Sequence, residues 1–423
     1  MFYSTNHMED KIPLHKTITF LLFFAIISTF LSPLFEEIFE LDTLSSLLSY
    51  VDELFVLGLC TYVGLTAKRY KTKNRLLGLI CVFSFIGIVS SYLYNGISVA
   101  NFLGGFNTIK PLLLFWALSA LTFGKGDIDY LFKLFSISFP LIMLFEFLDI
   151  MFPAFRSSIG FKLQISEERL GFRSIGGIMP RFTMATIMGV TYFYIYSFYR
   201  KSKPKALLSI PLILFALRVK DIFAFVIASM LTFNKRIKLK NLLIAIAALF
   251  LMFLGYMIYF PEHYAKYFSD DDELQARTAL NLTSIEISKD YFPLGVGFGK
   301  FGSPTSQQIE SDVYWKYGID TVYGLNYQYN SNFMSDTFWP MILGETGVLG
   351  LLMYVIILIV IFKPFIKIYT KQTTDLRVCI VVSLLVFNII CSIAKPTLTG
   401  PPNSLILFGF AGIFYSMLKL EKQ

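Results

Sequence analysis

The sequence predicts an all-α polytopic membrane protein with about twelve transmembrane helices and a large outer loop. Apolar residues make up 55% of the 423 residues and charged residues only 16%, whereas soluble domains average about 25% charged residues. The mean hydropathy is +0.62. The apolar residues also fall in runs near the roughly 20 residues that a membrane-spanning helix needs. A soluble enzyme with a polar shell is therefore excluded.

Each helix is predicted from one of these apolar runs. In chain order, we expect helices at residues 17–35, 44–67, 76–94, 107–123, 130–150, 181–199, 206–217, 221–233, 241–260, 338–362, 377–394 and 403–420. The first run follows Lys11 and Lys16, as the apolar part of a signal peptide would. It has no small-residue cleavage site before Glu36, so we interpret it as an uncleaved helix.

Two of the predicted helices are short for a membrane span. The runs 206–217 and 221–233 give about 18–20 Å of helix, against a hydrocarbon core of about 30 Å. Arg218 and Lys220 stand between them. Either the flanking residues snorkel to the surface, or these two cations lie at the floor of an outward cavity. Charge at that depth is costly and by default indicates a functional site.

The distribution of basic residues predicts the orientation of the helices. More than half of the 37 lysines and arginines lie near the two termini or in alternate loops, at 68–75, 200–205, 235–240 and 363–371. The positive-inside rule places these loops and both termini in the cytoplasm.

The remaining loops, which are rich in acidic residues, are then on the outer side. They include two long polar segments, 151–180 and 261–337. The chain is therefore predicted to consist of nine helices in 1–260, with the outer loop 151–180, then a large outer loop at 261–337, and three helices in 338–423. Loops of that length usually bind or catalyse something.

Several basic residues on the outer side are not explained by topology. Some stand beside proline at helix ends, as Lys110 and Lys395 do. Others flank short or broken helices and are candidate ligands for a pyrophosphate, because a guanidinium fork matches phosphate oxygens: Arg173, Arg181, Arg218, Lys220 and Arg277. The alternative is that each of them snorkels or pairs with a local carboxylate such as Asp221.

Two carboxylates stand where the large loop re-enters the membrane. Asp336 and Glu345 are nine residues apart, which places them on opposite faces of a helix and excludes a tight pair. Asp336 is either the N-cap of that helix or a carboxylate that orients or deprotonates a substrate. Asp52 and Glu53 are expected to pair with an outer lysine. The three histidines of the chain leave almost no material for a zinc site. We expect no metal site and no cofactor.

The large loop also holds a glycine-rich segment and a group of aromatic residues. Gly295–Gly302 fits a loose GxGxxG pattern but follows no predicted strand, so a dinucleotide site is not indicated. We expect a flexible turn that brings backbone N–H groups toward a sugar or phosphate. The aromatic residues either stack on sugars or fill the core of the loop itself: Tyr314, Trp315, Tyr317 and Tyr323.

Four parts of the sequence together resemble the Wzy-type O-antigen and capsular polysaccharide polymerases. They are Arg277, the turn Pro293–Gly302, the segment Tyr314–Gly318 and the re-entering segment Asp336–Gly350. The resemblance implies a GT-C-like membrane glycosyltransferase in the bacterial inner membrane. It also implies a metal-independent transfer of a glycan from undecaprenyl pyrophosphate onto another lipid-linked repeat unit at the outer face.

The resemblance further implies roles for particular residues. Arg173, Lys220 and Arg277 match basic positions of the family. Asp336 takes the place of a catalytic group, with Glu345 as the next candidate. The implied partners are undecaprenyl-pyrophosphate-linked oligosaccharides, membrane lipids and a chain-length regulator, with no nucleic acid.

Two other functions remain open. The related O-antigen ligases carry a His-Asn pair nine residues before the glutamate of ExGxxG. This sequence has Asp336 at that position and no histidine nearby, which favours a polymerase. A polysaccharide flippase or another transporter can also have twelve helices, but transporters usually show paired repeats, and none is visible here.

Overall fold

The computed structural model describes residues 12–37, 41–66, 74–152, 158, 168–169, 172–173, 182–233, 272–328, 331–371 and 375–421. Over these residues the fold is helical, apart from one antiparallel pair of two-residue strands. These are β1 (Glu168–Arg169) and β2 (Phe172–Arg173), with Glu168 opposite Arg173.

The helices follow the apolar runs closely. In the first half of the chain they are α1 (Ile12–Glu37), α2 (Asp42–Ser49), α3 (Val51–Leu65), α4 (Asn74–Asn95), α5 (Val99–Ala120), α6 (Lys125–Met151) and α8 (Phe182–Tyr194), which a π-helical turn extends to Tyr199. In the second half they are α9 (Lys203–Leu208), α10 (Pro211–Leu214), α11 (Val219–Phe233), α14 (Asp272–Asp290), α15 (Pro304–Gln308), α16 (Val313–Lys316), α17 (Trp339–Thr370), α18 (Leu376–Cys391) and α19 (Asn403–Leu420).

Seven helical segments among the described residues are long and apolar enough to cross a membrane. They are Leu14–Glu36, Asp42–Leu65, Arg75–Asn95, Lys125–Met151, Trp339–Thr370, Leu376–Ala394 and Asn403–Leu420. Each coincides with one of the twelve predicted segments. The prediction of an all-α polytopic membrane protein is therefore confirmed at this level.

The other predicted segments have different outcomes. Residues 107–123 lie mostly in α5, which is less apolar because it carries Asn101, Asn107 and Lys110, and residues 181–199 correspond to α8 and its extension. The segment 206–217 is not one helix, because the chain breaks between α9 and α10. The segment 221–233 lies within the 15-residue α11. The predicted helix at 241–260 lies outside the described residues.

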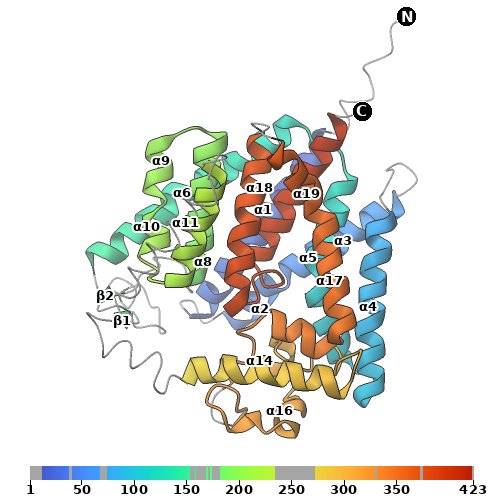
Figure 1. Ribbon diagram of the computed structural model, residues 1–423. Coiled ribbons are helices and arrows are strands. Elements are labelled where there is room, and N and C mark those ends of the chain that lie inside the picture. The colour runs from blue at the N-terminus through green and yellow to red at the C-terminus, as the bar shows by residue number, and fades with distance from the viewer. Residues whose placement is uncertain are drawn as a thin grey trace, which may run out of the picture.

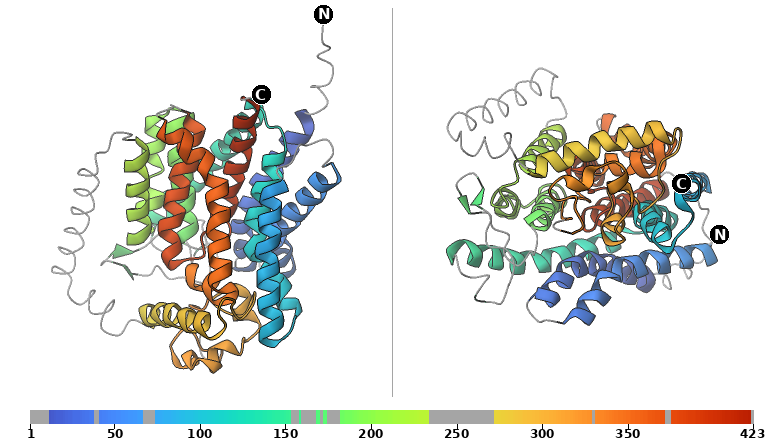
Figure 2. Two further views of the ribbon diagram at one scale, coloured as in Figure 1. Left: turned by 45° about the vertical axis from the view of Figure 1, so that its right-hand side comes forward. Right: turned by 90° about the horizontal axis from the view of Figure 1, so that it is seen from below.

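The long helices run side by side and form a bundle with two distinct ends (Figure 1). The start of α1 and the end of α19 lie at one end, and α14 and α16 lie across the other. Within the bundle, α5 packs on α19, α11 on α18, and α4 on α17. The view from below in Figure 2 shows α14 crossing the ends of the bundle helices. Part of the predicted large loop is thus a helical layer that covers one end of the bundle.

This layer, which we call the cap (residues 272–334), has a hydrophobic core of its own. Ala276, Leu280 and Ile287 on one face of α14 are buried against the rest of the cap. They pack with Val296, Phe301, Val313, Tyr314, Leu325 and Met334. The spacing of these α14 residues places them on one helical face. The cap is therefore built around a hydrophobic cluster that is separate from the core of the bundle.

The glycine-rich turn joins the cap to the bundle. The N–H groups of Val296 and Gly297 donate to the carbonyls of Gly344 and Glu345 in α17, at 2.9 and 2.8 Å. A Cβ atom on Gly295 would lie 2.2 Å from the Gly344 oxygen, so only glycine permits this approach. The expectation that the turn directs its N–H groups toward a ligand is wrong at these two positions, because both are bonded within the protein.

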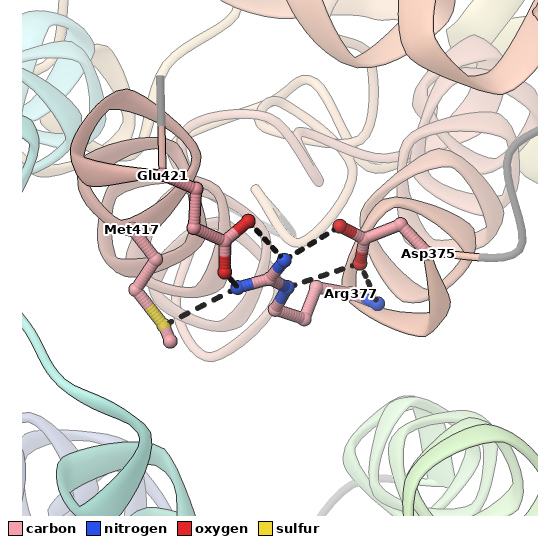
Figure 3. Close-up of polar contacts among 4 residues, drawn as sticks. All are labelled: Asp375, Arg377, Met417 and Glu421. Atoms are coloured by element: carbon pink, nitrogen blue, oxygen red, sulfur yellow. Dashed lines mark hydrogen bonds and ion pairs between the residues drawn. The ribbon is translucent and has the colours of Figure 1, made fainter. Parts of the chain in front are cut away.

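An arginine network closes the opposite end of the bundle, near the C-terminus (Figure 3). Arg377, at the start of α18, donates to Asp375 through Nη2 at 2.7 Å and Nε at 3.0 Å. It also donates to both carboxylate oxygens of Glu421, at 2.7 and 2.8 Å. Two bidentate pairs on one guanidinium fix its orientation. The network therefore ties the beginning of α18 to the end of α19.

Candidate functional site

Basic and acidic side chains from four separate segments meet between the bundle and the cap. The segments are the start of α11, the first part of α14, the residues before α17 and the residues after α18. We call the basic side chains of this group the cationic cluster: Arg218, Lys220, Arg277 and Lys395. Two carboxylates accompany them, Asp221 and Asp336.

Arg277 and Asp336 form the best-defined contact of the site. Nη2 of Arg277 lies 2.9 Å from Oδ2 of Asp336, and the two side chains are 24% and 26% exposed. Helix α17 begins at Trp339, and its N-cap position is Phe338, without a side-chain cap. The N-cap alternative for Asp336 is therefore wrong. The ion pair orients a partly exposed carboxylate at the entrance to α17.

The start of α11 contributes a row of charged residues. Lys220 donates from Nζ to the carbonyl of Ala394, at 2.7 Å, across to the end of α18. Asp221 is buried and accepts a hydrogen bond from Sγ of Cys391, at 3.3 Å. These contacts fix the start of α11 against the segment that follows α18. The charged residues at the junction of the predicted helices 206–217 and 221–233 therefore lie against another element.

Lys395 completes the cluster and was not among the predicted site residues. It is partly buried, and its ammonium forms neither an ion pair nor a hydrogen bond with any described residue. Burial lowers its pKa well below the ordinary value, and the neighbouring cations Arg218 and Lys220 lower it further, while Asp221 and Asp336 raise it. Its position next to Pro396 at a helix end was the one signal in the sequence that marked it.

The electrostatics of the site favour an anion. With every group ionised, four cations face two carboxylates, which leaves a net charge of +2. Burial lowers the pKa of Lys220 to about 8; Asp221 raises it, and Arg277 and Arg218 lower it. Cations that depress each other's pKa values are relieved when an anion binds among them. Two of the four are arginines, whose forked donors suit phosphate oxygens.

Three of the five predicted pyrophosphate ligands are brought together in this way: Arg218, Lys220 and Arg277. The other two are not placed in the cluster by the described structure. Arg173 lies in β2, opposite Glu168, and nothing further is described of its side chain. Arg181 lies outside the described residues. The prediction for these two arginines is thus untested.

Glu345 has a different environment from Asp336. Its side chain is fully buried, and Oε1 accepts the N–H of Phe301 at 3.4 Å. Its backbone carbonyl accepts the N–H of Gly297. Gly347, two residues later, has a φ of +69° and separates the first turns of α17 from the long helix. Glu345 thus holds the glycine-rich turn in place, and its burial does not support direct contact with a substrate.

The four predicted sugar-stacking residues divide into two groups. Tyr314 is fully buried in the cap, where its hydroxyl accepts the N–H of Gly302 at 3.0 Å. Tyr317 donates its hydroxyl to Asp290 at 2.8 Å. By contrast, Trp315 and Tyr323 are 46% and 51% exposed. The alternative that aromatic residues fill the core of the loop therefore holds for Tyr314, and an open aromatic surface remains at Trp315 and Tyr323.

The part of the chain that the structure describes contains no group of three or more His, Cys, Asp or Glu side chains that could hold a metal ion. The site consists of four basic side chains, one buried carboxylate and one partly exposed carboxylate. No known family model matches the chain, and a comparison with curated proteins likewise found no match.

Proposed function

We propose that this protein is a polysaccharide polymerase, a membrane glycosyltransferase that joins lipid-pyrophosphate-linked repeat units at the outer face of the bacterial inner membrane. The observation that carries the proposal is the convergence of Arg218, Lys220, Arg277 and Lys395 beside one partly exposed carboxylate. The resemblance of Arg277, the glycine-rich turn and the ExGxxG segment to Wzy-type polymerases supports the same reaction.

The cationic cluster suits the leaving group of this reaction. When the bond between the donor sugar's anomeric carbon and its pyrophosphate oxygen breaks, the lipid pyrophosphate takes the bonding electrons and gains negative charge. Preorganised cations in a water-poor site stabilise that charge in the transition state. The two arginines of the cluster, Arg218 and Arg277, remain charged at neutral pH and supply this stabilisation without a metal ion, as the resemblance to these polymerases implies.

Asp336 suits the acceptor side of the reaction. The acceptor hydroxyl oxygen forms the new bond to the anomeric carbon and must lose its proton. Asp336 is partly exposed, and Arg277 holds its carboxylate in one orientation at 2.9 Å. A carboxylate so placed can accept the proton or orient the hydroxyl, which is typical of general-base catalysis worth about 10²–10⁴ in rate.

The test is reconstitution of the full chain in liposomes with a purified undecaprenyl-pyrophosphate-linked repeat unit of the producing organism. We expect products that contain two or more repeat units, together with released undecaprenyl pyrophosphate. A ligase would transfer glycan only when lipid A core is added, and a flippase would move the repeat unit across the bilayer without lengthening it. Either of those results, with no elongation, would overturn the proposal.

A further inference from the structure

A small cavity with both charged and apolar lining residues lies next to the cationic cluster and is not used by the reaction described above. It has a volume of about 200 Å³ and lies between α3, α5, the start of α15, α17 and the residues after Lys395. Pro396, which follows Lys395 directly, lines it. Sites for drug-sized ligands measure about 300–1,000 Å³. This cavity therefore suits a single small ring.

The charge of the cavity is opposite to that of the cluster. Nζ of Lys110 lies 2.6 Å from Oδ2 of Asp52 and 3.6 Å from Oε1 of Glu53. Lys110 and Asp52 are almost wholly buried, whereas the Glu53 side chain is 23% exposed. One cation between two carboxylates leaves a net charge of −1. The cavity therefore disfavours a phosphate or a carboxylate ligand.

Several polar groups in this cavity remain available to a ligand. Oε2 of Glu53 accepts no hydrogen bond from any described residue, because Lys110 is directed at Asp52 and meets only Oε1. The side-chain amide of Asn107 likewise makes no hydrogen bond within the described part of the chain. Met341 and Pro401 add apolar surface to the lining. A carboxylate, an amide and apolar patches together match the hydroxyls and the C–H face of a sugar ring.

We propose that this cavity, the α3–α5 pocket, binds one neutral sugar residue of the glycan substrate. The inference rests on the proposed function only in taking a glycan as the substrate. Glu53 and Asn107 are the residues that recognise the hydroxyl groups, and the buried Lys110–Asp52 pair fixes Glu53. The position beside Lys395 places this sugar next to the pyrophosphate site. The negative charge selects against uronic acids.

The experiment measures sugar binding directly. The full-length protein in lipid nanodiscs, free of sugar-based detergent, is titrated with methyl glucoside, methyl galactoside and methyl glucuronide and followed by saturation-transfer NMR. At least one neutral glycoside is expected to bind, and the glucuronide is expected to bind at least about fivefold more weakly. Glu53→Gln and Asn107→Ala should each weaken the binding of the neutral glycoside by about fivefold or more. This is the change in affinity that follows from losing one hydrogen bond.

Two matched control variants make the same substitutions on exposed residues outside the pocket: Glu286→Gln and Asn95→Ala. Both should bind as the wild type does. The inference is overturned if no neutral glycoside binds the folded protein, if the glucuronide binds equally well, or if Glu53→Gln and Asn107→Ala bind normally. Sugar binding that persists while reconstituted protein makes no polymer would retain the pocket and overturn only the proposed transfer.

Discussion

The guanidinium of Arg277 and the carboxylate of Asp336 meet at 2.9 Å although they are 59 positions apart in the chain. Arg277 comes from the cap and Asp336 from the entrance to α17. Their contact therefore defines the boundary at which cap and bundle share one polar site. Under the proposed function, one member faces the leaving group and the other faces the acceptor.

Two replacements of Arg277 should separate the effect of its charge on elongation from the effect of its forked hydrogen-bond geometry. Arg277→Ala should reduce elongation in the liposome assay by 100-fold or more, about 3 kcal/mol of transition-state stabilisation. Arg277→Lys keeps the charge but loses the fork, so it should recover only part of the rate. Lys289→Ala is the matched control, because it removes an exposed cation from the same helix. If Lys289→Ala reduced elongation by the same factor, the result would contradict direct contact between Arg277 and the substrate.

Asp336→Asn should fold normally and elongate slowly. Asparagine retains an oxygen that Arg277 can bond but cannot take a proton, so we expect kcat to fall by about 10²–10⁴ with little change in the melting temperature. Asp320→Asn, elsewhere in the cap, is the control substitution. Single-turnover assays with both substrates bound measure the chemical step. A wild-type rate in Asp336→Asn would show that the base lies elsewhere.

Elongation should depend on pH through Lys220. Its pKa is lowered to about 8, so it carries a charge below that pH and loses it as the pH rises. The apparent KM for the donor lipid should therefore rise as the pH passes 8 and remain lower below it. Lys220→Arg keeps its charge throughout this range, so its KM should be less dependent on pH. A pH profile identical to that of the wild type would assign the effect to another group.

Glu345 should affect stability and activity together. Its buried carboxylate accepts the Phe301 N–H, and Glu345→Ala would leave this buried donor without its partner at a cost of about 1–3 kcal/mol. We expect a lower melting temperature, in contrast to Asp336→Asn. Differential scanning fluorimetry on the two purified variants makes the comparison. A fully stable but inactive Glu345→Ala would instead support a direct chemical role.

The two ends of the bundle should be accessible from opposite sides of the membrane. Gln308→Cys in the cap should react with an impermeant maleimide in intact cells, and Lys203→Cys in α9 only after permeabilisation. The parent protein, with its native cysteines, gives the background labelling. Labelling of Lys203→Cys in intact cells, with Gln308→Cys protected, would show the opposite orientation. The cationic cluster could then not meet a lipid-linked substrate at the outer face.

The sequence predicted the long helices because run length and hydropathy are local properties. It also singled out Arg218, Lys220 and Arg277, since each is a basic residue that topology leaves unexplained, and Asp336, which stands where the large loop re-enters the membrane. It could not predict the contacts between them, because the Lys220–Ala394 bond joins residues 174 positions apart.

Burial in the cap was equally difficult to predict. The region 272–290 contains many polar residues, which predict a loop, but its apolar residues Ala276, Leu280 and Ile287 form one helical face. The core built on that face buries Tyr314, which the local pattern alone could not separate from the exposed Trp315. Pro396 marks its neighbour Lys395 in the sequence, but the place of Lys395 in the cluster could not be predicted, because the other members come from distant segments.

The attachment of the glycine-rich turn to α17 has a mechanical consequence. Its N–H groups are bonded to the carbonyls of Gly344 and Glu345, and Asn101 of α5 donates to the carbonyl of Phe298 at 2.6 Å. Lifting the cap would break these buried bonds together. The cap is therefore fixed to the helices beneath it. Under the proposed function, a substrate with its tail in the bilayer would arrive from the side, between helices.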